Sequence, residues 1–151
     1  MRGIRGATTA ASNEADAIVE ATEELLRKLV SLNQLDVDEI ALAYFTATPD
    51  LDAEFPALAA RRLGWVEVPL LCGHEMAVRQ PNPRGVPLCV RVLLLYNTDR
   101  RQREMRHAYL RGASAIKQDL DAMRAQRFAL TGGAAVRGPR EIADFVGLEE
   151  P

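Results

Sequence analysis

The clearest element in the pattern of hydrophobic and polar residues is a helix between residues 15 and 33. Apolar side chains recur there at intervals of three and four, and most charged side chains fall between them. This spacing predicts a helix with one stripe packed against a sheet. The preceding Ser12-Asn13-Glu14 indicates a helix cap with an acidic residue in the first turn, and the helix is expected to end near Asn33. The stripe comprises Ala15, Ile18, Val19, Thr22, Leu25, Leu26, Leu29 and Val30.

Short apolar runs before and after this helix predict strands. They are rich in β-branched and aromatic residues and are separated by turn residues. The expected strands cover residues 3–9, 40–46, 65–72 and 88–96.

A second, short helix is expected between Pro56, which suits a first helical turn, and Gly64, which suits a helix end. The segment 100–117 is compatible with either a helix or a strand, because its apolar residues fit both periods. Strands that alternate with helices predict an α/β (α+β) fold, with one mixed sheet covered by about two helices.

One charged residue, Arg91, interrupts the run 88–96, which otherwise predicts a strand buried on both faces. Arginine stays charged, so burying it requires an anionic partner. That partner is either an internal Asp or Glu or an anionic ligand; the guanidinium could also reach solvent near a strand end. The sequence pattern leaves these alternatives open.

Composition limits the classes of partner. The chain has 151 residues, of which 48% are hydrophobic and 26% charged, as expected for one globular core. Its net charge of -2 gives no overall attraction for nucleic acid or for an anionic membrane. No apolar stretch reaches spanning length and the N-terminus lacks the apolar segment of a signal peptide, so a cytoplasmic location is expected. The cysteines Cys72 and Cys89 are expected to remain thiols.

Metal and nucleophile chemistry find little support. Cys72, His74 and Glu75 are close in sequence, but only Cys89 and His107 remain to complete a zinc site, so no metal or cofactor is expected. Cys72 has no specific base in the sequence, and an isolated thiol is most often a small core residue.

Cations on separate segments suggest a different kind of site. Their convergence would create a pocket for a polyanion, in which Glu75 could orient a hydroxyl and Tyr109 could add a hydrogen bond. The basic residues of the run 100–111 are more consistent with a solvated turn than with a nucleic-acid surface. The separate cations are Arg5, Arg61, Arg91 and Lys117.

Several motifs, in a fixed order over residues 1–120, resemble the AroH-class chorismate mutases. Any one of them alone would be weak, whereas together they are specific. The motifs are Arg2-Gly3-Ile4-Arg5-Gly6-Ala7-Thr8-Thr9, Ala47-Thr48-Pro49-Asp50-Leu51, Phe55-Pro56-Ala57, Val68-Pro69, Cys72-x-x-Glu75-Met76, Cys89-Val90-Arg91-Val92 and Arg106-His107-x-Tyr109-Leu110.

The resemblance implies a homotrimer whose mixed sheets build a pseudo-barrel, with active sites between adjacent subunits. It also implies a strand in the ambiguous segment 100–117. The implied reaction is the Claisen rearrangement of chorismate to prephenate, on the route to phenylalanine and tyrosine. That reaction is intramolecular and needs no nucleophile, general base or cofactor. The protein then contributes substrate conformation and fixed charge.

The resemblance also implies a role for each matching residue. Arg91 would stabilise the charge on the breaking ether oxygen, Arg5 would hold a carboxylate, and Glu75 would bind the ring hydroxyl with help from the Cys72 backbone. Tyr109 and Lys117 would contact the substrate as well. The remaining expected contacts are Leu71 and Cys72 around the ring, and Phe55, Ala57 and Arg61 from the neighbouring subunit.

The chain departs from the family pattern in three places. Leu58 replaces a usual lysine, and Lys117 replaces a usual arginine, which keeps the charge but loses the forked hydrogen bonding. Residues 121–151 form an extension beyond the family's usual end, expected to be flexible. It could contain a short helix around Ile142, Phe145 and Val146, and either pack on the trimer or cover the cleft.

Three other functions remain compatible with the residues. One is an imine deaminase-like enzyme on the same trimeric fold, although the additional Arg5 and Glu75 argue against it. A second is a sensor that binds chorismate or prephenate without turnover. The third is a purely structural trimer, in which Arg5 and Arg91 would pair internally.

Overall fold

The computed structural model describes residues 1–79, 81–82 and 84–130, and this part of the chain contains a five-stranded mixed sheet. The strand order is β3-β2-β4-β1-β5. β4 is antiparallel to both β1 and β2, whereas β3 is parallel to β2 and β5 is parallel to β1. The strands are β1 (Arg2–Thr9), β2 (Ile40–Ala47), β3 (Leu70–His74), β4 (Cys89–Tyr96) and β5 (Ala108–Tyr109).

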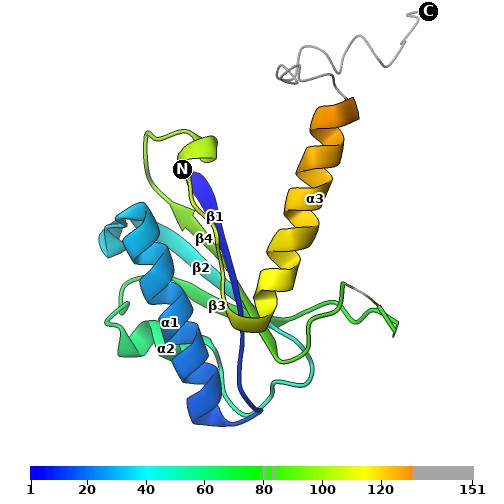
Figure 1. The fold of residues 1–151 in the computed structure, drawn as a ribbon. Helices are drawn as coiled ribbons and strands as arrows, with labels where there is room; N and C mark the ends of the chain where they lie inside the picture. Colours follow the sequence, from blue (N-terminus) through cyan, green and yellow to red (C-terminus); the bar gives the residue numbers. More distant parts are fainter. Residues whose placement is uncertain (80, 83, 131–151) are drawn as a thin grey trace, which may run out of the picture. The chain divides into compact units, whose positions relative to one another are not determined.

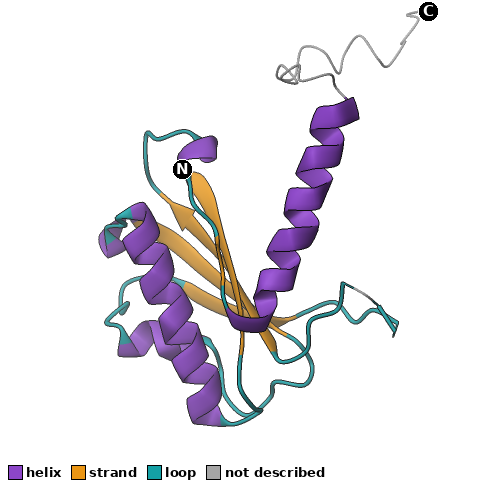
Figure 2. Cartoon of the chain, in the orientation of Figure 1, coloured by secondary structure: helices purple, strands orange, loops and turns teal. Residues whose placement is uncertain are grey.

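Two helices cover one face of this sheet. α1 (Ala15–Asn33) and α2 (Ala57–Arg62) lie beside each other on the same side of the strands (Figure 1). Figure 2 shows the same layers by element type. The prediction of a mixed sheet covered by two helices is therefore confirmed for residues 1–117, which form one compact unit.

The core lies between α1 and the sheet. The α1 stripe buries Leu25 and Leu29 completely, against Ile4 of β1 and Leu94 of β4. Gly6 allows this close approach, because a Cβ atom there would lie 2.8 Å from Leu29 Cδ1. Removing these apolar side chains from water stabilises the fold by about 1.5–3 kcal/mol for each fully buried one.

One expected boundary was wrong. The strand expected over 65–72 starts only at Leu70, because Gly64 takes a left-handed φ of 86° and Trp65 packs into the core without joining the sheet. The helix α1 begins directly after Ser12-Asn13-Glu14, as expected, but its N-cap residue Glu14 makes no side-chain cap bond. Asn13 instead accepts from the backbone N–H groups of Asp52 and Ala53.

The ambiguous segment 100–117 contains both alternatives. It includes the short strand β5 and then the start of α3 (Ser114–Leu130). A second compact unit begins at Gln118, and its described part is helical. The helix expected around Ile142, Phe145 and Val146 lies outside the described residues.

Candidate functional site

The face of the sheet opposite α1 and α2 carries a row of residues in register across all five strands. Residues paired between neighbouring strands share a face because side chains alternate along each strand. Arg91 of β4 pairs with Ala7 of β1 and with Thr46 of β2. Ala7 in turn pairs with Tyr109, and Thr46 pairs with Gly73. The topology thus brings residues from distant parts of the sequence onto one surface, which we call the open face.

Arg91 is not buried on both sides, contrary to the expectation from its apolar neighbours. Successive side chains of β4 point to opposite faces of the sheet, so Val90, Val92 and Leu94 face the core while Arg91 and Leu93 lie on the open face. The Arg91 side chain is 40% exposed, and its Nη1 lies 3.5 Å from Oε2 of Glu75. Its Nε atom is buried and has no hydrogen-bond partner among the described residues.

Glu75 is held by the backbone and by a side chain. The chain leaves β3 after His74, and the Glu75 N–H donates to Ala47 O at 2.9 Å. The hydroxyl of Thr46 donates to Oε1 of Glu75. The carboxylate, only 22% exposed, therefore faces Arg91 in a defined orientation.

Arg5 and Tyr109 lie on the open face near Arg91. Arg5 pairs with Leu93 and is exposed, and its backbone N–H donates to His107 Nδ1 at 3.1 Å. Tyr109 packs against a small cluster of Ala7, Cys89 and Ala113, to which Val86 and Ile116 also contribute. This cluster forms an apolar patch next to Arg91.

A second group of expected site residues lies on the helix-covered side. Cys72 pairs with Phe45, packs against the core and lies near Ala57 and Arg61 of α2. Burial raises the pKa of the Cys72 thiol, and the Ala57 backbone and the Arg61 charge offset this only in part. Phe55, just before α2, is 69% exposed.

One chain therefore does not gather all expected site residues. Arg5, Glu75, Arg91 and Tyr109 share the open face, together with Leu71, which is 59% exposed. Cys72, Ala57 and Arg61 lie on the other side of the sheet. Lys117 is exposed, and Leu58 is half-buried against the core beside Ala57.

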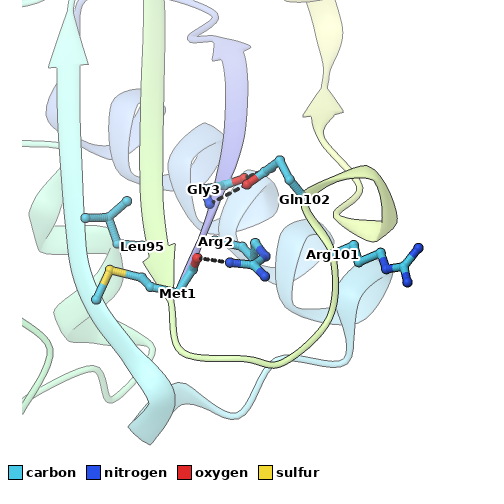
Figure 3. A pocket seen from close by; sticks show the side chains of 6 residues that line it. All are labelled: Met1, Arg2, Gly3, Leu95, Arg101 and Gln102. Atoms are coloured by element: carbon cyan, nitrogen blue, oxygen red, sulfur yellow. Dashed lines mark hydrogen bonds between the residues drawn. The ribbon is translucent and has the colours of Figure 1, made fainter. Parts of the chain in front are cut away.

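A shallow hollow of about 490 Å³ lies elsewhere on the sheet and shares no residue with either group. Figure 3 shows Met1, Arg2, Gly3, Leu95, Arg101 and Gln102 around it. The Arg2 guanidinium already donates to backbone carbonyls, and Gln102 exchanges hydrogen bonds with Gly3. The Arg2 and Gln102 side chains of this hollow are therefore already engaged within the chain.

Neither a metal centre nor a membrane span is found in the part of the chain that the structure describes. No three His, Cys, Asp or Glu side chains gather there as ligands would. None of its helices is sufficiently long and apolar to cross a bilayer.

Sequence reasoning missed Thr46 and the role of His107. Thr46 appeared only as the end of an apolar strand, and a lone histidine carries little signal. The strand register places Thr46 beside Arg91, and His107, just before β5, accepts a hydrogen bond from the Arg5 backbone N–H.

Comparison with known proteins places the chain beside one family. The family model described as chorismate mutase type I matches residues 1–120. Chorismate mutase AroH of Thermus thermophilus is 44% identical over 123 residues, covering 81% of this chain and 98% of that protein. Chorismate mutase AroH of Bacillus subtilis (strain 168) is 39% identical over 121 residues, covering 80% and 92%.

A solved structure shows the same fold. A chorismate mutase from Clostridium thermocellum superposes with a TM-score of 0.70 at 44% identity, covering 74% of this chain and 96% of that one. The order of motifs, the arrangement of the sheet and these matches lead to one conclusion: the chain belongs to the type I chorismate mutase family.

Proposed function

We propose that this chain, a chorismate mutase, uses Arg91 as the fixed charge that accelerates the rearrangement of chorismate to prephenate. Chorismate carries two carboxylates, and negative charge develops on its ether oxygen as the C–O bond breaks. A donor that is already in place when this charge appears stabilises the transition state more than the ground state. For this rearrangement the protein has to hold the substrate in the reactive conformation and to place a fixed positive charge at the ether oxygen.

The buried Nε of Arg91 is the observation that carries this proposal. A buried donor without an acceptor costs about 1–3 kcal/mol, and more when it belongs to a charged group. Nε has no hydrogen-bond partner by distance and angle among the described residues, although the Cys89 thiol interacts with the Arg91 side chain, and Nη1 is close to Glu75. An acceptor supplied by a ligand would satisfy Nε, and a developing oxyanion is such an acceptor.

The surrounding residues suit the rest of the substrate. Glu75, with help from the Cys72 backbone, would bind the ring hydroxyl, and Arg5 would bind a carboxylate as an exposed cation on the same face. Tyr109 would contact the pyruvyl side and Leu71 the ring. Lys117 would supply charge without the forked geometry of arginine, which weakens substrate binding but leaves the role of Arg91 intact.

We further propose that each active site needs two copies of the chain. Phe55, Ala57 and Arg61 lie on the side of the sheet opposite Arg91, so they reach the substrate only as part of a neighbouring copy. The exposed Leu71 and Leu93 give the open face apolar area that such a neighbour would cover. A closed trimer, with its sheets arranged as a pseudo-barrel, would supply this contact three times.

The extension and the location belong to the same proposal. The boundary proposed between residues 120 and 121 falls inside α3, and the extension would pack on the trimer or cover the cleft. A chain that ends at Asp121 tests this, and unchanged stability and kinetics would remove both roles.

A cytoplasmic location is supported by Cys72 and Cys89, which are free thiols.

The direct test is to mix the purified protein with chorismate and follow the loss of ultraviolet absorbance. Product identity is checked by converting prephenate to phenylpyruvate with acid, and subunit number by light scattering. Rapid conversion by a trimer is the expected result. Binding without conversion would overturn the proposal in favour of a sensor, and a monomer that retains full activity would overturn the shared site.

A further inference from the structure

Thr46 lies between the two groups that carry the proposed chemistry. Its Cα is in register with Arg91 on one side and with Gly73 on the other. Its hydroxyl donates a hydrogen bond to Oε1 of Glu75, while Oε2 of the same carboxylate lies 3.5 Å from Arg91 Nη1. One hydroxyl and one guanidinium thus contact opposite oxygens of a single carboxylate.

This division limits how Glu75 can pair with Arg91. An arginine and a carboxylate readily form a two-pronged pair in which both oxygens accept from the same guanidinium. The Thr46 hydroxyl engages Oε1 and so fixes the rotation of the carboxylate, and in this rotation Oε2 lies 3.5 Å from Arg91 Nη1. The buried Nε of Arg91 keeps its hydrogen-bonding capacity for an acceptor from outside the described chain.

The backbone supports the same arrangement. Glu75 follows Gly73 by two residues and therefore continues on the open face, and its N–H bond to Ala47 O keeps it beside β2. A Cβ atom at Gly73 would collide with the Tyr44 hydroxyl, so glycine allows Tyr44 to lie over β3 on this face. The carboxylate is left within reach of the Thr46 hydroxyl.

We propose that Thr46 is a positioning residue, which holds Glu75 in the orientation that leaves Arg91 available to the ether oxygen of the substrate. The inference rests on the proposed roles of Arg91 and Glu75. Without the hydroxyl, the carboxylate rotates into a two-pronged pair and draws the guanidinium away from the reacting bond. Such a change weakens a contact that matters most in the transition state, so kcat falls more than KM rises.

The test compares three single variants. Thr46→Val keeps the shape of the side chain and removes the donor, so kcat should fall about tenfold, as for a lost hydrogen bond to a charged group. KM should change less than about threefold. Thr46→Ser restores the hydroxyl and should recover most of the wild-type rate. Thr8→Val is the matched control, since the buried Thr8 hydroxyl has no partner among the described residues and the rate should stay at the wild-type value.

A double-mutant cycle shows whether Thr46 acts through Glu75. In a Glu75→Ala background, Thr46→Val should cause no further loss, because the group that it positions is gone. The same tenfold loss in both backgrounds, or full activity in Thr46→Val, would overturn the inference. Unfolding midpoints close to wild type exclude a general loss of structure.

Failure of the inference can be told apart from failure of the proposed function. If the wild-type chain converts chorismate, depends on Arg91 and is insensitive to Thr46→Val, only the role of Thr46 is wrong. If the wild-type chain does not convert chorismate at all, both are wrong.

Discussion

Arg91 and Glu75 meet across an intervening strand. β2 separates β4, which carries Arg91, from β3, which Glu75 follows, yet Nη1 and Oε2 are 3.5 Å apart. Both side chains are partly exposed, at 40% and 22%, so solvent screens their attraction and the pair contributes at most about 1 kcal/mol to stability. The contact is therefore better suited to orienting two charged groups than to holding the fold together.

Removing the charge of Arg91 should abolish most of the catalysis. Arg91→Ala is expected to lower kcat by at least about two to three decades, which is the effect of losing an oxyanion donor. The kcat of Arg91→Lys should lie between those of the wild type and Arg91→Ala, since lysine keeps the charge but cannot donate a hydrogen bond from Nε. Chorismate loss measures the rate, and Arg103→Ala, at an exposed position, is the control. Near-normal turnover in Arg91→Ala would rule out the assignment.

A shared site predicts that two inactive variants can complement each other. Arg91→Ala and Arg61→Ala should each be strongly impaired. When they are unfolded together and refolded as an equal mixture, roughly a quarter of all sites should contain both arginines, all of them in mixed trimers. Recovery to about that fraction of wild-type activity is expected in the mixture and not in either variant refolded alone. Activity equal to the mean of the two would place the site within one chain.

Because α1 packs closely on β1, alanine substitutions at two glycines of this strand should change the free energy of unfolding by different amounts. Gly6→Ala should destabilise the protein by about 1–3 kcal/mol, because its Cβ would press on Leu29 in a close-packed core. Gly3→Ala is the matched control, since the nearest atom to its Cβ would be Leu93 Cδ1 at 3.7 Å. Urea unfolding measures both. Equal losses in the two variants would contradict this account of the packing.

Asn33 should be more important to stability than its polarity suggests. It is 1% exposed, and its side chain exchanges hydrogen bonds with the backbone of Arg106, fixing the segment that leads into β5. Asn33→Ala should cost about 1–3 kcal/mol, because two backbone groups of Arg106 lose their partner at a part-buried site. Asn13→Ala, which removes hydrogen bonds at an exposed site, should cost less than about 1 kcal/mol. A larger loss of stability in Asn13→Ala than in Asn33→Ala would show that the segment at Arg106 is held by other contacts.

The cysteines predict a loss of stability at alkaline pH. Burial raises the pKa of both the Cys72 and Cys89 thiols in the folded chain. Their contribution to stability is therefore complete below the unfolded pKa of about 8.5 and is lost as the pH rises through the folded pKa. The free energy of unfolding of the wild type, measured against the variant Cys72→Ala/Cys89→Ala, should decline from about pH 8 to pH 10. A constant difference would contradict these shifts.

The sequence predicted the parts of the fold that depend on periodic burial. α1 was predicted because its stripe recurs over many turns, and β2 because its apolar run is bounded by clear turn residues. Trp65 misled the placement of β3, since an aromatic residue is buried here beside a short helix and not within a strand. The apolar run around Arg91 could not reveal which of its faces another element covers.

The candidate site was predictable only in part. Arg91 stood out as a charge among apolar residues, and the family motifs supplied Glu75, Arg5 and Tyr109. Thr46 had no comparable signal, because its position depends on strand register, which arises from pairings distant in sequence. Likewise, only the topology of the sheet reveals that Arg61 and Arg91 lie on opposite sides of it.

The hydrogen bond from the Arg5 N–H to His107 Nδ1 affects how the outer strand meets other chains. β5 is only two residues long, so most of that edge of β1 would otherwise offer its amide groups to a passing strand. The imidazole takes the place of a backbone carbonyl at Arg5 and ends the ladder with a side chain. At this point a side chain of the same chain thus occupies the β1 amide that an incoming strand would need.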